Sequence, residues 1–302
     1  MNGPISLADI SKGDIVYSIC TLVTKLEQYN QLVKSFVDHG FSYDDCEYIY
    51  IDNSKDNQYE AYRGINKFLT TAAGRYIVIC HQDVLLIDDG REKLDAAVRE
   101  LDRTDPNWGV CGNAGGIYPG RLALRITDPH GDNQFTEPLP RRVSGLDENF
   151  LVVRRDANLA LSGDLKGFHL YGTDICIVAY LLGYTAYVVD FHLRHLSEGV
   201  KTRRAAGKND PNFAELRSTL IAKYRRAMRP RVATSPVTAV YLGRSMGLSP
   251  ILNALLATSI PRRFGRLRKM FEPRATQEAV GGAGFATTNT APGTTLATRS
   301  KR

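Results

Sequence analysis

Short apolar segments alternate with segments of helical periodicity along the first part of the chain, and this alternation limits the folds available to it. Apolar runs at 14–20, 47–52, 76–80 and 108–112 have the length and composition of buried strands. Between these runs, apolar residues recur every three or four positions, as in helices that cover a sheet. The pattern predicts an α/β fold, in which a mostly parallel sheet is flanked by helices.

Three helices are expected between these strands. The first should end at Gly40 and the second before Gly74, because glycine is common just beyond a helix end. Residues at helical spacing share one face, which we expect to pack against the sheet. These apolar faces consist of Tyr29, Leu32, Val33, Phe36 and Val37; of Ala61, Tyr62, Ile65, Phe68 and Leu69; and of Leu94, Ala97, Val98 and Leu101.

The cysteines and the N-terminal sequence indicate a cytoplasmic protein. The five cysteines have no CxxC spacing, and several lie in apolar runs, as reduced core thiols do. The N-terminus lacks the basic and apolar regions of a secretory signal. No apolar stretch reaches the about 18 residues that a membrane span needs.

The formal net charge of +7 favours an anionic partner, such as nucleic acid, anionic lipid or a nucleotide-linked substrate. Nucleic acid is the least favoured, because the arginines are not interleaved with aromatic residues in a recognisable reading module. Apolar residues at helical spacing between the arginines of 260–271 predict an amphipathic helix in peripheral contact with an anionic membrane, at the inner face of the plasma membrane. A solvated basic face is the alternative.

Polar residues follow the first three predicted strands, where a parallel sheet has its ligand crevice. Asp52 suits hydrogen bonds to a base or ribose, and His81 with Asp83 suits a divalent cation. A simple turn at 52–57 and a surface histidine are the alternative, but three such segments at one edge favour a site. The candidates at the strand ends are Thr21; Asp52, Asn53 and Ser54; and His81, Gln82 and Asp83.

The order of strand, "IDNSKDN", helix and "GRYIVICHQDV" resembles the nucleotide-sugar-binding half of GT-A glycosyltransferases of the inverting family 2 type, in their "HQDV" subgroup. In that family an Asp-x-Asp motif holds a metal, and here the motif is His81-x-Asp83. An imidazole with a carboxylate suits Mn²⁺ better than Mg²⁺. The resemblance implies a divalent cation, Mn²⁺ or Mg²⁺, and a nucleotide-diphosphate sugar donor. The implied donor contacts are Thr21, Asp52, Asn53, Ser54 and Gln82.

The segment 167–199 resembles the acceptor and metal segment of the same family. Asp174 falls at the second acid of its motif and Gly172 where the first would stand. The resemblance implies that Asp174 is the catalytic base, although a helix-capping role is the alternative. It also implies that His195 completes the metal site. His192 is a second ligand or, more in keeping with its position, a packing residue.

Other segments complete the predicted site. The basic loop 198–212 suits closure over the donor phosphates, with Lys201, Arg203 and Arg204 as contacts; solvated charge is the alternative. The segment 115–156 reads as loops over the substrate that precede a strand at "FLVV", residues 150–153. Tyr118, Arg125, Glu148 and His169 are the candidate acceptor contacts.

The predicted organisation is a GT-A domain at 1–212, a basic helical region at 213–272 with helices at 213–229 and 245–271, and a disordered tail at 273–302. The predicted function is metal-dependent, inverting transfer of a sugar to the hydroxyl of a glycan or lipid-linked acceptor, in bacterial-type polysaccharide synthesis. The departures at His81 and Gly172 favour a non-catalytic binding relative as the alternative. A sugar nucleotidyltransferase is less favoured, because no glycine-rich loop follows the first strand.

Overall fold

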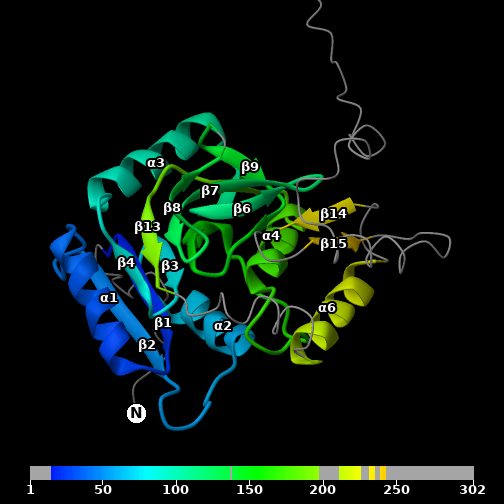
Figure 1. Ribbon diagram of the computed structural model, residues 1–302, viewed down its shortest axis with the longest axis horizontal. Coiled ribbons are helices and arrows are strands. Elements are labelled where there is room, and N and C mark those ends of the chain that lie inside the picture. Colours follow the sequence, from blue (N-terminus) through cyan, green and yellow to red (C-terminus); the bar gives the residue numbers. More distant parts are fainter. Residues whose placement is uncertain (1–14, 137, 197–210, 226–230, 235–238, 243–302) are drawn as a thin grey trace, which may run out of the picture. The chain divides into compact units, whose positions relative to one another are not determined.

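The main sheet has seven strands in the order β2-β1-β3-β11-β5-β12-β9. At one edge of it β1 lies between β2 and β3 (Figure 1). The computed structural model describes residues 15–136, 138–196, 211–225, 231–234 and 239–242. Five of the seven strands run in one direction, whereas β11 and β9 run in the other. The predicted α/β class and mostly parallel sheet are confirmed. The strands are β1 (Tyr17–Val23), β2 (Cys46–Asp52), β3 (Tyr76–Cys80), β5 (Trp108–Gly112), β9 (Arg141–Val143), β11 (Phe150–Arg154) and β12 (Thr185–Val188).

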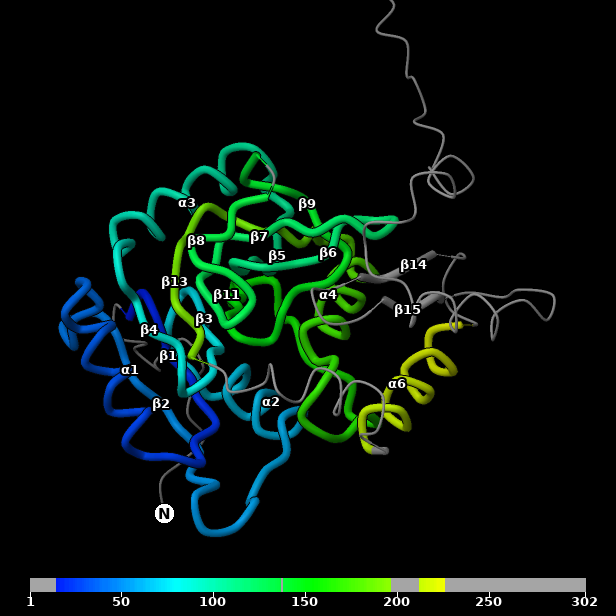
Figure 2. The backbone as a smooth tube through the Cα atoms, viewed as in Figure 1, coloured from blue at the N-terminus to red at the C-terminus, as the bar shows by residue number. Residues whose placement is uncertain are grey.

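Helices cover both faces of this sheet, as the tube in Figure 2 also shows. One core cluster contains the buried residues of α1 and α3, and the other contains those of α2, α4 and α6. Neighbouring residues of β1 point to opposite clusters, since Ile19 belongs to the first and Cys20 to the second. The helices are α1 (Leu26–Asp38), α2 (Ala61–Thr71), α3 (Arg91–Thr104), α4 (Tyr171–Leu181) and α6 (Pro211–Tyr224).

The predicted apolar faces are confirmed as the packed faces of α1, α2 and α3. Their central residues, such as Leu32, Ile65 and Val98, are at most 2% exposed. Gly40 follows α1 with a φ of +92°, a left-handed conformation that favours glycine. All five cysteines are buried and carry free thiols.

A second sheet has the order β10-β6-β7-β13-β4, with β8 beside β7. Most of β6 and all of β7, β8 and β10 fall within 115–149, so the prediction of loops there is wrong. The alternating leucine and isoleucine side chains of β7 pack inwards, where Leu124 and Ile126 are buried. This sheet consists of β4 (Val84–Leu86), β6 (Ala114–Ile117), β7 (Arg121–Asp128), β8 (Gly131–Phe135), β10 (Gly145–Leu146) and β13 (Leu193–His195).

Towards the C-terminus, α6 agrees with the helix predicted from residue 213. Its residues Leu216, Leu220 and Tyr224 are buried in the same cluster as α2 and α4. Two antiparallel strands follow, β14 (Arg231–Thr234) and β15 (Ala239–Leu242). The predictions for 245–271, including the amphipathic helix, and for the tail at 273–302 lie outside the described residues. Within the described part of the chain, no helix is long and apolar enough to cross a membrane.

Candidate metal and donor site

Three parallel strands and one strand of the second sheet bring the predicted residues to one edge. Because β1, β2 and β3 are parallel neighbours, the segments that follow them emerge on the same side. From the second sheet, β13 pairs with β4 and places His195 opposite Val84. The backbone amide of Leu196 donates to the carbonyl of Asp83, at 2.9 Å. This pairing holds the two halves of the candidate metal site together.

His81, Asp83 and His195 form a compact cluster. One ligand atom from each lies within 4.8 Å of the other two. The Nε2 atom of His195 is 3.3 Å from His81 Nδ1 and 3.3 Å from Asp83 Oδ1. The structure thus brings together the three residues predicted as metal ligands, although His81 and His195 are 114 positions apart in the sequence.

A hydrogen-bond chain behind the cluster fixes the orientation of His81. The hydroxyl of Tyr171 donates to the backbone carbonyl of Glu148 at 3.1 Å and lies 2.9 Å from His81 Nε2. Because that hydroxyl proton is engaged, its oxygen accepts from His81 Nε2, so Nδ1 carries the lone pair. The lone pair therefore faces His195 and Asp83. A partner behind a ligating imidazole is typical of protein metal sites.

The local electrostatics suit a ligand set. Burial, with the charge of His195, lowers the pKa of His81 to about 4, so its ring is neutral near pH 7. Burial alone would lower the pKa of His195, but the hydrogen bond and charge of Asp83 raise it. Burial alone would raise the pKa of Asp83, but the hydrogen bond and charge of His195 outweigh it and lower the pKa of that carboxyl. The cluster thus supplies an ionised carboxylate and an imidazole lone pair.

The two imidazoles and the carboxylate fit a divalent cation. They offer nitrogen and oxygen atoms from two chain segments, 81–83 and the end of β13, as transition metals prefer, and they leave coordination positions for a ligand. An oxygen-only set would suit Mg²⁺ better. The preference for Mn²⁺ over Mg²⁺ stays a prediction.

The turn after β2 is built by its own side chains. The Nδ2 atom of Asn53 donates to the carbonyl of Tyr59 at 2.8 Å, and its Oδ1 accepts from the amide of Tyr59. Asp52 Oδ1 accepts from the amide of Ser54. Asn53 is 7% exposed, whereas Ser54 is exposed. Asn53 thus shapes the loop, and Asp52 with Ser54 remain at the surface where a donor could bind.

Gln82 holds the loop between β1 and α1. Its Oε1 accepts from the backbone amides of Thr24 and Lys25, each at 2.8 Å. Its Nε2 donates to the hydroxyl of Thr24 at 2.9 Å. Lys25, the N-cap of α1, caps no helix amide with its side chain. Gln82 therefore satisfies amides at the start of α1 and joins that loop to the metal cluster.

Thr21 does not lie where the prediction placed it. Its side chain is fully buried, and its hydroxyl is 3.6 Å from the sulfur of Cys80 on the neighbouring strand. A hydroxyl inside the sheet cannot contact a donor. The assignment of Thr21 as a donor contact is therefore wrong, because β1 continues to Val23 before it leaves the core.

Asp174 also lies in the interior, so its assignment as catalytic base is wrong. It is fully buried, and Oδ1 accepts from the hydroxyls of Ser162 and Tyr224 at 2.8 and 2.7 Å, while Oδ2 accepts from the amide of Ser162. Burial raises the pKa of this carboxyl. It is the acid in the first turn of α4, as the alternative reading has it, but the hydrogen bonds of its carboxylate go to Ser162 and Tyr224 and not to amides of that helix. Asp174 instead ties the segment before α4 to α6.

Gly172 stands where the family motif has its first acid, and packing explains the difference. A Cβ atom there would lie 2.4 Å from the carbonyl oxygen of Leu146. The nearby Glu148 is buried, which together with the charge of Asp147 raises its pKa to about 8, against the backbone amides of Leu170 and Gly172. A carboxyl from another loop thus occupies the start of α4.

The other predicted contacts are scattered. Glu148 is only 8% exposed, so its carboxyl does not reach an acceptor directly. His169 is exposed beside Phe213, with ring centroids 5.4 Å apart. Tyr118, which precedes a cis-proline, is half-buried in the turn between β6 and β7. Arg125 is engaged by Asp190, at 2.8 Å.

His192 packs rather than ligates, as the sequence favoured. It is 3% exposed, and its Nε2 lies 2.9 Å from the hydroxyl of Thr127. Its Nδ1 lies 3.4 Å from Asp88. The predicted phosphate contacts Lys201, Arg203 and Arg204 lie outside the described residues.

Two residues near the cluster were not predicted. Tyr171 holds His81, and half-buried Asp147 is close enough to raise the pKa of His195. Asp147 accepts from the amide of Asn149 at 3.0 Å, in the loop between β10 and β11. No local pattern points to Tyr171, but the acids of "LDEN" just before a strand are such a signal for Asp147.

Comparison with known proteins places the chain in a family. No protein-family model matches it. The ATP synthase subunits region ORF 6 protein of Fuscovulum blasticum is 36% identical to it over 246 residues, which cover 80% of this chain and 96% of that protein. The chain belongs to the family of this ORF 6 protein. The name of the ORF 6 family states no activity, so a function must be argued from the site.

Two solved structures have partial similarity to the chain. One is the mannosyltransferase PcManGT from Pyrobaculum calidifontis in complex with GDP-Man and Mn²⁺; it is 12% identical, with a TM-score of 0.48, over 68% of this chain and 64% of that one. The other is S. aureus TarS 1-349 in complex with UDP-GlcNAc, also 12% identical with a TM-score of 0.48, over 70% and 66%. The chain spans less than two thirds of either.

Proposed function

We propose that this chain is a GT-A type glycosyltransferase that moves a sugar from a nucleotide-diphosphate donor to a hydroxyl acceptor. The observation that carries the proposal is the cluster of His81, Asp83 and His195 at the carboxyl edge of the parallel strands. A ligand set at this edge, beside an acidic turn after β2, matches the chemistry that a nucleotide diphosphate needs.

His81, Asp83 and His195 would hold a divalent cation, which when bound would offset the charge that develops on the diphosphate leaving group. Tyr171 keeps the Nδ1 lone pair of His81 directed at the cluster. Gln82, between His81 and Asp83, accepts from the amides of Thr24 and Lys25. It therefore holds the loop after β1 in place beside the metal cluster, where we expect that loop to contact the donor. Asp52 and Ser54, in the turn after β2, are the other proposed contacts to the donor.

The proton of the acceptor hydroxyl needs a carboxylate that an acceptor can reach. Asp174 and Glu148 are too deeply buried for this role. Asp147 is half-buried, stands beside Glu148, and acts electrostatically on both histidines of the cluster. We assign the base to Asp147. Direct attack by the acceptor hydroxyl on the anomeric carbon would invert its configuration.

Donor turnover tests the proposal. Purified chain would be incubated with a panel of uridine, guanosine and thymidine diphosphate sugars and Mn²⁺, and the release of nucleoside diphosphate measured. Slow hydrolysis of one donor is expected even without an acceptor, since water can replace the hydroxyl. If no donor is hydrolysed and none is bound in calorimetry, the proposed function is wrong. Binding without hydrolysis or transfer would favour the non-catalytic relative.

A further inference from the structure

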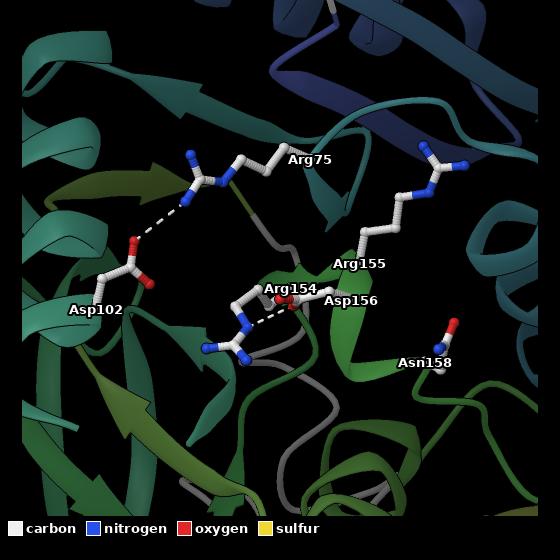
Figure 3. Close-up of a pocket in the computed structure, with 6 residues that line it drawn as sticks. All are labelled: Arg75, Asp102, Arg154, Arg155, Asp156 and Asn158. Atoms are coloured by element: carbon white, nitrogen blue, oxygen red, sulfur yellow. Dashed lines mark hydrogen bonds and ion pairs between the residues drawn. The ribbon is translucent and has the colours of Figure 1, made fainter. Parts of the chain in front are cut away.

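A cavity of about 560 Å³ lies at the other end of β3 from His81. Figure 3 shows the side chains that line it. Charged residues and one amide line it: Arg75, Asp102, Arg154, Arg155, Asp156 and Asn158. Arg75 directly precedes β3, and Arg154 pairs with Tyr76 across the antiparallel β11. Arg75 and His81 flank the five residues of β3, so six steps separate them, about 20 Å at the usual rise per residue.

The framework of this cavity is fixed. The side chain of Arg154 is 15% exposed; its Nη1 donates to the carbonyl of Pro106 at 2.7 Å, and its guanidinium lies over the rings of Trp108 and Tyr184. Asp102 accepts from the indole of Trp108 at 2.8 Å. The guanidinium of Arg155 donates to the carbonyl of Ala73.

The charge of the cavity is not balanced. Arg75 pairs with Asp102 at 3.5 Å and Arg154 with Asp156 at 2.5 Å, as the dashed lines in Figure 3 show. Arg155 meets only a neutral carbonyl among the described residues, so the lining carries one excess positive charge. The Arg75 pair is long and its side chain is 68% exposed, so this guanidinium can turn to another anion.

We propose that this cavity binds a small molecule that carries a diphosphate group. Guanidinium forks match phosphate oxygens in pairs, and the contacts to Asp102, Asp156 and the two backbone carbonyls engage only part of the donors of the three guanidinium groups. A volume of about 560 Å³ suits a small molecule. The site is separate from the catalytic edge and does not depend on the proposed function.

Calorimetric titration with pyrophosphate, in the presence of a chelator that removes divalent cations, tests this proposal. We expect one molecule to bind per chain. Arg75→Gln and Arg155→Gln should each weaken binding by about tenfold or more, because each removes charge-assisted hydrogen bonds. Arg99→Gln is the matched control, since it removes the same charge from an exposed residue of α3 that does not line the cavity. The affinity of Arg99→Gln for pyrophosphate should remain within about twofold of that of the wild type.

Thermal unfolding of each variant would confirm that it is folded, and the exposed Arg75 provides the safer substitution. Inorganic phosphate should bind more weakly than pyrophosphate, because it reaches fewer guanidinium groups; equal affinities would contradict the diphosphate assignment. The proposal is overturned if pyrophosphate does not bind at millimolar concentration, or binds equally to folded Arg75→Gln and Arg155→Gln. Loss of pyrophosphate binding in Asp83→Ala would also overturn the proposal, because it would show that pyrophosphate binds at the metal cluster.

Discussion

At the residue scale, the cluster depends on side chains behind its ligands. The Nε2 atom of His81 faces the hydroxyl of Tyr171, and its Nδ1 atom faces His195. One nitrogen thus orients the ring, and the other is free to bind a metal. Substitution of a residue that hydrogen-bonds to a metal-bound histidine typically weakens metal binding by 10- to 100-fold. Tyr171 and Asp147 should therefore matter almost as much as the ligands.

Tyr171→Phe should weaken Mn²⁺ binding by about tenfold or more, because His81 loses the acceptor that orients it. Calorimetry with Mn²⁺ would measure the change. Tyr62→Phe is the matched control, since Tyr62 is also buried and donates to the carbonyl of His169, away from the cluster. Equal Mn²⁺ affinity in the two folded variants would contradict the orienting role of Tyr171.

Asp147→Asn and Asp174→Asn should separate catalysis from stability. Asp147→Asn should lower kcat by about 10² or more with little change in unfolding temperature, because an amide cannot take the acceptor proton. Asp174→Asn should leave kcat within about twofold but cost about 1–3 kcal/mol of folding free energy, since an amide NH₂ would face the amide of Ser162. Initial rates and thermal unfolding measure both. A large rate loss confined to Asp174→Asn would restore Asp174 as the base.

At the scale of elements, α4 is set by close backbone contact. Its residue Gly172 packs against the carbonyl of Leu146 in β10, and Glu148 lies beside the same helix end. The contact brings Tyr171 to His81. The start of α4 therefore serves the site through Tyr171, while the acid of its first turn, Asp174, points into the interior.

Gly172→Ala should destabilise the fold by about 1–3 kcal/mol, because the added methyl would meet the carbonyl oxygen of Leu146 at 2.4 Å. Gly163→Ala is the control, since a Cβ there meets nothing within 4 Å. Denaturant unfolding compares the two. Equal stabilities would show that α4 shifts freely, and the packing explanation for this glycine would fail.

The sequence predicted the elements that have a strong local period and the residues that follow them. The strands β1, β2 and β3, the helices between them, and the pair of His81 and Asp83 at the end of β3 follow from local patterns and chain order, whereas His195 was assigned to the cluster through the family resemblance of 167–199. Thr21 and Asp174 were misplaced because burial depends on which neighbour covers a residue. For Asp174 that neighbour is Tyr224, fifty positions away. The strands of the second sheet were missed because glycine and proline obscure their alternation.

At the scale of the whole molecule, ion pairs connect elements that are distant in the chain. Arg91 at the start of α3 makes two hydrogen bonds to Asp45 before β2, at 3.0 and 2.7 Å, and a third contact to Asp95. The hydrogen bonds from Arg91 lower the pKa of Asp45. This pair fastens α3 to the outer strand β2.

Stability should fall in acid partly through Asp45. Because its pKa is lower in the folded state, its contribution is present above the unfolded value of about 3.9 and is lost as pH falls through the folded value. Asp45→Asn should therefore reduce the drop in unfolding temperature between pH 6 and pH 3. Asp38→Asn, an exposed aspartate of α1, is the control. An unchanged pH profile in Asp45→Asn would contradict the role of this pair.

The central claim is that the cluster at the sheet edge supports metal-dependent glycosyl transfer. The most direct measurement is the rate of donor turnover as Mn²⁺ is titrated, in the wild type and in Asp83→Ala, which removes the only carboxylate of the cluster. We predict that turnover rises to saturation with Mn²⁺ in the wild type and falls by about 10² or more in Asp83→Ala at every concentration. Equal turnover by both proteins at saturating Mn²⁺ would contradict the account.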